Sequence, residues 1–407
     1  MIERIVIENF KSLHRVDLTL GRLNVFIGTN ASGKSNFFDA LRLLQGIGYG
    51  FTFHEILDGK PKGATSEVWD GIRGGSQKAT YFNAPTDEPI RIKVEGKLGT
   101  NGTTKTWIYE IAFSAVEGRL RSEKLNVDGD IYDSSTIHNA VLDPAFEVRY
   151  YGGKQSRPPH LKFDKNRPVI GQFARGANGK WNKTHADWAE QVTRQLADMQ
   201  RLDPSPSILR AYSQAHEIKR MGEHGENFAA LIKTITADPK TKDSYLSWLR
   251  ELRPHEVDDV GTLPGAVGEP MFMLREGSRD QPALVLSDGT LRFAAITAAF
   301  FQPEMPGLLT IEEIENGIHA SRLRLLVELL RVRAAEGQTQ ILVTSHSPIV
   351  LAWLKPEEYA STFFCKRDGT TGESRIKPLV EIEHFMNVVQ RQPIADLFAE
   401  GWLENAL

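Results

Sequence analysis

One short segment of the chain has glycines, a lysine and a serine spaced to hold a phosphate. Residues 28–35 read Gly-Thr-Asn-Ala-Ser-Gly-Lys-Ser and fit the pattern GxxxxGK[ST] without a mismatch. The two glycines allow a tight turn whose backbone N–H groups approach an anion without a Cβ between them. We expect Lys34 to reach the β- and γ-phosphates and the Ser35 hydroxyl to bind Mg²⁺. The predicted nucleotide-binding residues of this segment are Gly28, Asn30, Ala31, Ser32, Gly33, Lys34, Ser35 and Asn36.

Two adjacent carboxylates follow a second apolar run. Residues 308–311, Leu-Leu-Thr-Ile, predict a buried parallel strand, and Glu312 and Glu313 follow at the end where open α/β sheets bind ligands. We expect Glu312 to hold Mg²⁺ through water and Glu313 to polarise the attacking water. Asp is the usual residue at the first position, so the side chain of Glu312 is one methylene longer. The alternative is a strand that ends in a solvated acidic loop, because Glu315 is also close by.

Two further segments carry groups suited to a phosphate. His346 follows an apolar run at 340–343 and lies in a polar turn closed by Pro348, which suggests a γ-phosphate sensor. A single histidine in such a turn can also be purely structural. Ser287 and Gly289 precede a predicted helix at 290–301 and offer a hydroxyl and a backbone N–H to an anion. Their alternative role is an ordinary helix cap.

The elements that position these residues are visible as apolar patterns. Residues 23–27 predict a buried strand, and the spacing of apolar residues from Asn36 to Leu44 predicts a helix whose N-terminus faces the phosphates. Residues 90–98 and 105–113 alternate, and 125–132 carry Asp-Gly between two apolar arms, which indicates a hairpin. This stretch therefore predicts an antiparallel lobe.

Residues 184–252 have the spacing of helices. Thr184 and Asp187 resemble a capping box, and Trp188, Val192, Leu196 and Met199 share one helical face. Further helices are predicted around 207–220, 226–236 and 241–251, and a return linker at 253–269. The predicted domains are an N-terminal lobe with the phosphate-binding segment and the antiparallel sheet at 1–183, a helical insertion at 184–262, a C-terminal lobe with the carboxylates and His346 at 263–385 and a tail at 386–407.

Several of these segments resemble one group of proteins. Ile5-Val6-Ile7-Glu8-Asn9-Phe10-Lys11-Ser12 is similar to the start of SMC and RecF-like ABC-type ATPases, and Leu286-Ser287-Asp288-Gly289-Thr290-Leu291-Arg292 resembles their signature motif. The segments 312–319 and 345–348 resemble the subgroup of overcoming-lysogenization-defect (OLD) nucleases and bacterial defence ATPases. The motifs cover residues 1–50 and 280–350. The signature departs from LSGGQ at Asp288 and lacks Gln at position 290.

The resemblance implies a fold, a ligand and a dimer. It predicts an α/β P-loop NTPase of the ABC type, with the antiparallel lobe and a compact helical insertion, that binds ATP and Mg²⁺. Two heads of this family sandwich two ATP molecules, so Ser287 and Gly289 would complete the site of the partner subunit. ATP as the base is itself implied by the resemblance, since no NKxD segment that would read guanine is present.

Comparison with arm-bearing and nuclease-bearing relatives narrows the expected role. The helical zone is too short and interrupted for the long coiled coil of SMC and break-repair ATPases. Only 61 residues follow His346, and they predict a hairpin around Asp368-Gly369 and a short helical tail in place of the TOPRIM domain of OLD nucleases. The resemblance therefore implies an ATPase head that controls a separately encoded effector, such as a nuclease, in bacterial defence or DNA metabolism.

Composition is that of an intracellular enzyme. The chain has 407 residues, 41% hydrophobic and 25% charged, enough for a sizeable core in two or three lobes. Cys365 is the single cysteine, which excludes an internal disulfide and a cysteine-based zinc cluster. The first residues read as a strand, not as a secretory signal, and no apolar run approaches the roughly 20 residues of a membrane span. These features predict a cytoplasmic protein without membrane contact.

Charge is concentrated in one segment. The formal charge of the chain is −3, yet residues 149–183 hold nine Lys or Arg and one acid, Asp164. The interleaved aromatics are Tyr150, Tyr151, Phe163, Phe173 and Trp181. Basic residues with aromatics are suited to nucleic-acid backbones and exposed bases. Docking of an acidic partner, a phosphate-facing loop of the ATP site and a solvated face are the alternatives.

Two other functions compete with the ATPase. The first is a scaffold or clamp that binds ATP without hydrolysing it and engages a partner protein, against which the Glu313–His346 pair argues. The second is the motor subunit of a membrane transporter, against which the segment Asn9-Phe10-Lys11-Ser12 and the missing signature Gln argue.

Overall fold

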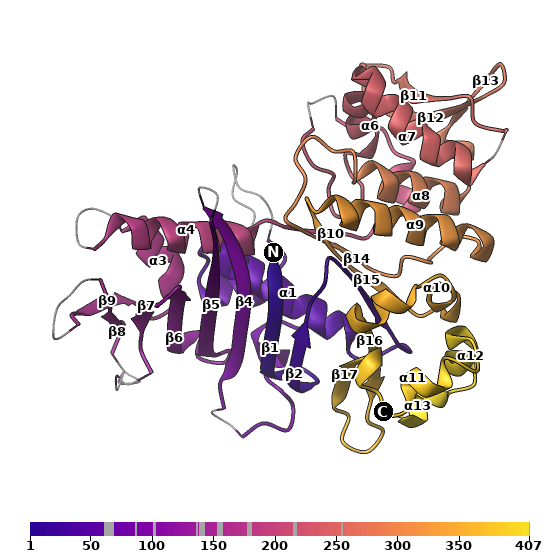
Figure 1. The fold of residues 1–407 in the computed structure, drawn as a ribbon. Coiled ribbons are helices and arrows are strands. Elements are labelled where there is room, and N and C mark those ends of the chain that lie inside the picture. Colours follow the sequence, from indigo (N-terminus) through magenta and orange to yellow (C-terminus); the bar gives the residue numbers. More distant parts are fainter. Residues whose placement is uncertain are drawn as a thin grey trace.

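A long helix that begins at the phosphate-binding motif packs against two β-sheets. This helix, α1 (Lys34–Tyr49), buries Phe37, Leu41 and Leu44 against one continuous cluster that includes side chains from both sheets. The computed structural model describes residues 1–60, 69–85, 88–100, 103–135, 137, 143–152, 158–176, 181–214, 218–253 and 255–406. Figure 1 shows the antiparallel sheet on one side of the molecule and the helices α6 to α9 on the other.

The central sheet is mostly parallel. Its first five strands in spatial order run parallel to one another, and the last pairs antiparallel with its neighbour. Its strands within the described residues are, in that order, β10 (Met199–Leu202), β14 (Leu308–Ile311), β15 (Gln340–Ser345), β3 (Leu23–Ile27), β16 (Thr362–Arg367) and β17 (Ser374–Pro378). The carboxyl ends of β3, β14 and β15 therefore meet at one edge, where the predicted site residues follow them.

The second sheet is antiparallel throughout. Within the described residues its strands lie in the order β2 (Leu13–Thr19), β1 (Ile2–Phe10), β4 (Ile90–Thr100), β5 (Thr103–Ser114), β6 (Arg119–Val127), β7 (Asp130–Asp133), β8 (Ala145–Tyr150) and β9 (His160–Asp164). Three helices accompany it, α2 (Phe53–Asp58), α3 (Val169–Arg175) and α4 (Lys183–Ala197). Alternating burial along β5 and β6 fits one face packed on the core and one face in water.

The opposite face of the central sheet is covered by helices. These are α5 (Pro206–Leu209), α6 (Phe228–Ala237), α7 (Pro239–Leu252), α8 (Asp288–Ala298) and α9 (Ala320–Glu336), beside a small antiparallel sheet of β11 (Asp259–Pro264), β12 (Pro270–Glu276) and β13 (Arg279–Pro282). Short helices follow at α10 (Pro348–Ala352), α11 (Phe385–Val388), α12 (Ile394–Ala399) and α13 (Trp402–Ala406). Figure 1 shows α10 to α13 grouped near the C-terminus.

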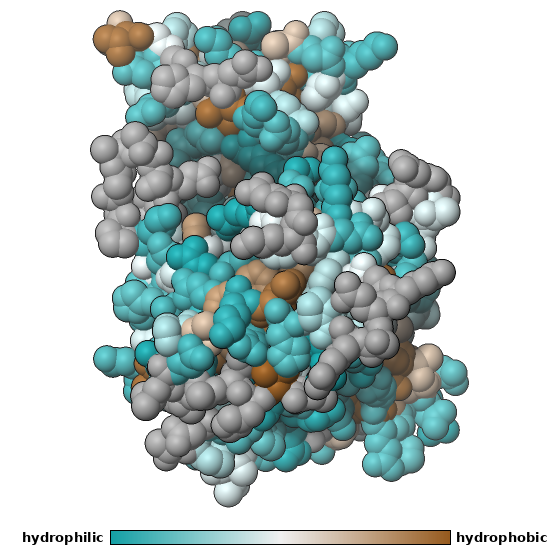
Figure 2. Space-filling model, turned by 90° about the vertical axis from the view of Figure 1, so that its left-hand side faces the viewer, coloured by the Kyte–Doolittle hydropathy of each residue, from teal (hydrophilic) through white to brown (hydrophobic). Residues whose placement is uncertain are grey.

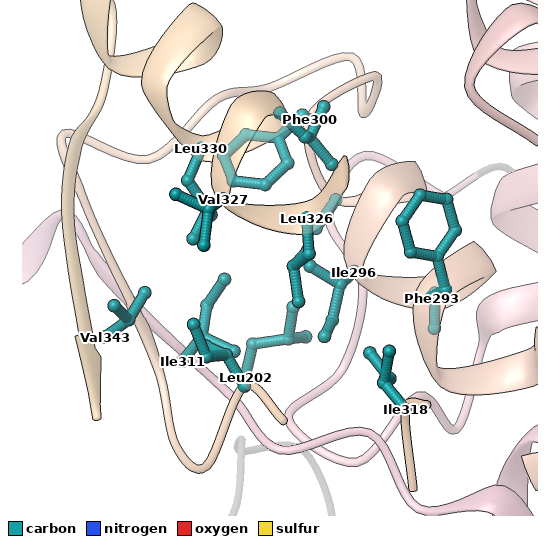
Figure 3. Close-up of a cluster of buried hydrophobic side chains, with 14 of the residues drawn as sticks. Leu202, Phe293, Ile296, Phe300, Ile311, Ile318, Leu326, Val327, Leu330 and Val343 are labelled. Carbon is teal, nitrogen blue, oxygen red and sulfur yellow. The ribbon is translucent and has the colours of Figure 1, made fainter. Parts of the chain in front are cut away.

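The contact between the sheet and these helices is a dry core. Figure 3 shows Leu202, Ile311 and Val343 on the strands facing Leu326 and Val327 of α9 and Ile296 of α8. Ile296, Ile311 and Val343 are fully buried. Packing of this kind fixes the strand ends that carry Glu312 and His346 relative to α8, which carries the signature segment.

The structure confirms the α/β prediction with an antiparallel lobe. The strands predicted at 23–27 and 308–311 have these bounds, and the Asp128-Gly129 hairpin joins β6 to β7. The hairpin around Asp368-Gly369 is present between β16 and β17. The helices predicted around 226–236 and 241–251 correspond to α6 and α7.

Four local expectations between 184 and 269 were wrong. Residues 199–202 form β10, because pairing with β14 overrides the helical spacing of Met199. Asn182, not Thr184, caps α4 by accepting a hydrogen bond from the backbone of Thr184. The described residues 210–214 and 218–220 are not helical. The expected linker contains β11, which pairs with β12. The predicted domain boundaries stay predictions.

Candidate nucleotide-binding and hydrolysis site

The phosphate-binding loop joins β3 to α1 through two positions that tolerate only glycine. A Cβ on Gly28 would lie 2.1 Å from the carbonyl oxygen of Cys365 on β16, so the loop runs directly against a neighbouring strand. Gly33 has φ 103° and a Cβ there would lie 2.3 Å from Ser374 Oγ. Both glycines are thus required by close approach, and the second also by its left-handed backbone.

Lys34 lies at the first position of α1 with its ammonium inside the loop. Its Nζ donates to the carbonyl oxygens of Gly28 at 2.6 Å and Thr29 at 2.8 Å, and the residue is 4% exposed. Burial lowers the pKa of Lys34, and nearby carboxylates oppose this effect. The positive charge is therefore held at the N-terminus of α1, where the helix dipole also favours an anion.

Glu312 and Ser35 supply oxygens on the two sides of this edge. Ser35 Oγ lies 3.4 Å from Glu312 Oε2, so the hydroxyl of α1 and the carboxylate after β14 face each other. A hydroxyl and a carboxylate are hard oxygen ligands of the kind Mg²⁺ binds, usually together with water and substrate phosphates. No cluster of three or more His, Cys, Asp or Glu that could hold a metal occurs in the described residues. The pair fits Mg²⁺ held jointly with a phosphate.

Glu313 and His346 contact each other across the strand ends of β14 and β15. Glu313 Oε1 lies 3.1 Å from His346 Nε2, while His346 Nδ1 lies 2.9 Å from the carbonyl oxygen of Gly28. Glu313 has a left-handed backbone (φ 48°), and its N–H donates to Thr344 Oγ1 at 2.9 Å. The backbone N–H of His346 donates to Glu315 Oε1 at 2.5 Å. These contacts of Glu313 and His346 point the carboxylate and the imidazole toward the phosphate loop.

One pocket of about 330 Å³ collects most of the predicted residues. It is lined by the predicted residues Asn30, Ala31, Ser32, Gly33, Lys34, Ser35, Asn36, Glu313 and His346. Sequence reasoning had not selected Ser12, Phe82 and Arg367, which also line it. Ser12 stood in the quoted N-terminal segment and accepts a hydrogen bond from Asn36 Nδ2 at 2.6 Å. No signal pointed to Phe82 or Arg367, since the fold alone brings them here.

Ser287 and Gly289 lie apart from that pocket. Ser287 caps α8 by accepting from the backbone of Thr290, and it lines a different cavity of about 420 Å³. A Cβ on Gly289 would lie 2.3 Å from the carbonyl oxygen of Gly317, so the start of α8 packs closely on the loop after Glu313. Within one chain, the signature segment does not reach the phosphate loop.

Two arginines that sequence reasoning missed contact the carboxylate loop. Arg292 of α8 is 3% exposed, and its Nη2 donates to the carbonyl oxygens of Glu312 at 2.8 Å and Glu313 at 3.2 Å. Arg201 of β10 forms an ion pair with Glu312 at 2.7 Å. Arg292 ends the quoted signature segment and could have been selected from it. Arg201 lay in a stretch expected to be helical, so nothing in the sequence placed it beside Glu312.

The interpretation of three aromatic residues in the basic segment as base-stacking groups was wrong. Tyr150, Phe163 and Phe173 are buried and pack on one another and on Trp181, whose ring stacks on Phe173 at 4.9 Å between centroids. Side chains in this cluster are part of the core and cannot stack on bases. Tyr150 and Phe163 point inward from β8 and β9, where every second residue faces the core, and Phe173 packs on both of them from α3.

The positive charge of that segment is partly neutralised. Lys162 Nζ lies 3.1 Å from Glu147, and Arg167 Nε lies 3.3 Å from Asp164. Lys165 is 1% exposed. Lys154, Arg157 and Lys180 lie outside the described residues. Figure 2, which looks onto this end of the molecule, shows mostly hydrophilic side chains with smaller apolar areas between them. Nucleic-acid binding by 149–183 stays a prediction, without base stacking by Tyr150, Phe163 or Phe173.

A search for membrane spans gave no candidate: none of the helices in the described part of the chain has both the length and the apolar character to cross a bilayer.

Comparison with known proteins gives matches along most of the chain. Residues 23–352 match the family described as "AAA domain, putative AbiEii toxin, Type IV TA system". A protein of Helicobacter pylori named ATP/GTP phosphatase is 23% identical over 361 residues, which cover 85% of each chain. A protein of Thermus scotoductus named OLD nuclease is 22% identical over 357 residues, which are 86% of this chain and 59% of that protein.

A solved structure shares the fold. The SMC head bound to the C-terminal winged-helix domain of ScpA aligns with 95% of this chain and 99% of its own, with a TM-score of 0.50 and 13% identity. This likeness shows that the chain shares the fold of an SMC head.

Proposed function

Because the chain belongs to the AAA-domain family that residues 23–352 match, an ATPase family with SMC-, RecF- and OLD-like members, we propose that it binds ATP with Mg²⁺ and hydrolyses the γ-phosphate. One observation carries the proposal. The phosphate loop, the buried Lys34, and the pair Glu313 and His346 line a single pocket, with Glu312 facing Ser35 beside it. These are the groups that phosphoryl transfer to water requires.

Each side chain has a part that follows from its position. Lys34 exchanges loop carbonyls for phosphate oxygens, and the N–H groups of the loop add further donors. Ser35 and Glu312 would hold Mg²⁺, and the bound ion would neutralise charge on the β- and γ-phosphates. Glu313 accepts a proton from the attacking water as general base. His346 keeps the Glu313 carboxylate oriented through its 3.1 Å contact and faces the γ-phosphate.

The proposed working unit is a dimer of heads. The signature residues Ser287 and Gly289 would bind the nucleotide held by the partner subunit. The position of Ser287 supports this arrangement, because Ser287 lines a different cavity from the one lined by the phosphate loop of its own chain. ATP would close the dimer and hydrolysis would reopen it.

The proposed biology is control of a separate effector by the nucleotide cycle. The family description names a putative toxin of a toxin–antitoxin system, and one relative is named OLD nuclease. Both support a cytoplasmic protein of bacterial defence or DNA metabolism whose closed dimer switches an effector such as a nuclease. The competing scaffold function, ATP binding without turnover, is decided by the experiment below.

Replacement of Glu313 by Gln tests the proposal. The variant keeps the loop, Lys34 and the metal ligands but loses the base, so phosphate release should fall by about 10²-fold or more. It should also accumulate as a larger species in size-exclusion chromatography with ATP and Mg²⁺. Wild-type turnover by Glu313→Gln would remove Glu313 from the mechanism. Nucleotide binding without phosphate release by the native protein would favour the scaffold.

A further inference from the structure

We propose that Arg201 is a positioning residue that holds Glu312 in place for Mg²⁺. The inference rests on the proposed function and assigns a new part of the same site. Arg201 lies on β10, and its Nη2 is 2.7 Å from Glu312 Oε1. The other carboxylate oxygen, Oε2, faces Ser35 Oγ at 3.4 Å. Glu312 therefore bridges an arginine on one side and the hydroxyl of the phosphate-loop helix on the other.

The backbone register brings the two residues together. β10 and β14 run parallel, with Arg201 beside Thr310 and Leu202 beside Ile311. The N–H of Glu312 donates to the carbonyl oxygen of Leu202 at 3.3 Å, which continues this pairing one residue past β14. The guanidinium thus comes from the immediate neighbour of the strand that presents the carboxylate, and β10 is an edge strand with no other pairing partner among the described residues.

Burial makes the ion pair more than a surface contact. The side chain of Glu312 is 13% exposed and that of Arg201 is 24% exposed. Charges removed this far from water interact strongly, and loss of one partner leaves an uncompensated charge. The pair also gives a reason for the unusual Glu at this position. The longer side chain carries the carboxylate one methylene farther from the backbone than Asp would, to a position between Arg201 and Ser35.

Arg201 is itself held from behind. Its Nη1 lies 3.3 Å from Glu223 Oε1, and Glu223 Oε2 lies 3.6 Å from Arg42 Nη1. Arg42 is on α1, two turns after Ser35, and its guanidinium lies 4.3 Å from the ring centre of Trp69. The chain of contacts returns to the helix that carries the hydroxyl ligand. It therefore fixes both proposed metal ligands, Ser35 and Glu312, relative to each other.

Removal of Arg201 has a defined consequence in this arrangement. Two carboxylates, Glu312 and Glu223, would lose the cation between them and repel each other. Glu312 would turn away from Ser35, so the affinity for Mg²⁺ would fall and a higher Mg²⁺ concentration would be needed to fill the site. Residues that orient a metal ligand in this way typically change affinity for the metal by about 10- to 100-fold.

The experiment measures metal-dependent nucleotide binding rather than turnover alone. The probe is a non-hydrolysable ATP analogue with an imido β,γ-bridge, titrated calorimetrically across a series of Mg²⁺ concentrations, with phosphate release measured in parallel. We expect Arg201→Gln to raise the half-saturating Mg²⁺ concentration about 10-fold or more, to lower kcat, and to leave binding of the analogue without Mg²⁺ unchanged. Arg201→Lys should recover part of the loss, because lysine restores the positive charge but lacks the planar guanidinium that contacts both Glu312 and Glu223.

A matched control and a double mutant separate positioning from general stability. Arg220 forms an ion pair with Asp198 in which the charged atoms lie 2.6 Å apart. This pair does not contact the proposed metal ligands, so Arg220→Gln should leave the Mg²⁺ dependence unchanged. In a Glu312→Asp background the carboxylate is drawn back by one methylene, so we expect its contact with Arg201 to be weakened. Arg201→Gln should then cost much less than it costs alone.

The outcomes distinguish this inference from the proposed function. The wild type is titrated first, and absence of Mg²⁺-dependent analogue binding there would overturn both. Wild-type binding together with a half-saturating Mg²⁺ concentration within about twofold for folded Arg201→Gln would overturn the positioning role alone. An equal shift in Arg220→Gln, or fully multiplicative effects in the double mutant, would also overturn it.

Discussion

Buried ionisable side chains are stabilised here in two different ways. Lys34 lies among carbonyl oxygens that serve as acceptors until phosphate oxygens replace them. Glu123 of β6 is buried in the antiparallel lobe and accepts hydrogen bonds from the hydroxyls of Tyr109 and Tyr132 and from two backbone N–H groups at the start of α3. The contacts of Lys34 leave it ready to bind a ligand, while those of Glu123 connect α3 to the antiparallel sheet.

Glu123 makes the stability of this lobe depend on pH. Burial raises the pKa of Glu123 from 4.5 to about 7, although its four hydrogen bonds act in the opposite direction. A raised carboxyl pKa means that the folded state binds the proton more tightly, so stability falls as pH rises from about 4.5 to about 7 and is level above that. Glu123→Gln is neutral throughout. As pH rises from about 4.5 to about 7, the free energy of unfolding of the variant should therefore increase relative to that of the wild type by roughly 3 kcal/mol.

Chemical denaturation of both proteins at pH 5 and pH 8 measures this difference. Arg121→Gln, a substitution on the same strand outside the buried cluster, serves as the control with no such pH dependence. A difference between Glu123→Gln and wild type that is the same at both pH values would mean that the four donors keep the carboxylate ionised throughout.

At the scale of elements, the sequence predicted those whose position follows from local pattern. β3 and β14 are short, largely apolar runs next to residues of distinctive chemistry, and both were predicted at their observed bounds. β10 was missed because its four residues continue the helical spacing of α4 and form a strand only through pairing with β14. The burial of Tyr150, Phe163 and Phe173 was missed because these residues come from two strands and a helix that meet only in the folded lobe. Arg201 and Arg367 reach the site through tertiary contacts that no local pattern encodes.

The turn between β3 and α1 allows a direct test of one predicted glycine. Gly28→Ala places a Cβ 2.1 Å from the carbonyl oxygen of Cys365, which β16 cannot move without losing its pairing with β3. Overpacking of this kind costs about 1–3 kcal/mol. We expect a lower thermal midpoint and weaker ATP binding. Gly369→Ala is the matched control, since a Cβ there would meet nothing within 4 Å. Equal midpoints for the two variants would show that the loop can shift away from β16.

At the scale of the whole molecule, the proposed dimer would build each nucleotide site from parts of both chains. The phosphate loop and the carboxylates lie in one pocket, and Ser287 lines another. Arg292 connects them, because it stands on the signature helix and donates to the backbone of Glu312 and Glu313. A nucleotide of the partner subunit that contacts Ser287 would thus act on the helix that supports the catalytic loop of its own chain. This connection offers a physical route by which hydrolysis at the two sites of a dimer could be coupled.

Mixing two inactive variants tests whether the halves meet across a dimer. Ser287→Arg places a bulky cation where the partner's phosphate would lie, so it should bind ATP but not hydrolyse it. Lys34→Ala removes the charge at the phosphate loop and should bind ATP poorly. In a mixed dimer, one interface combines the intact phosphate loop of the first variant with the intact signature of the second. Phosphate release should therefore recover at that interface, to at most about one quarter of the wild-type rate per head if the two variants pair at random.

Lys34→Ala mixed with Glu313→Gln is the control, because both lesions lie in the phosphate-loop half. Its mixed dimer still pairs every intact signature with a damaged loop and should show no recovery. Turnover that stays absent at every ratio of Ser287→Arg to Lys34→Ala would mean that Ser287 does not act on a partner's nucleotide.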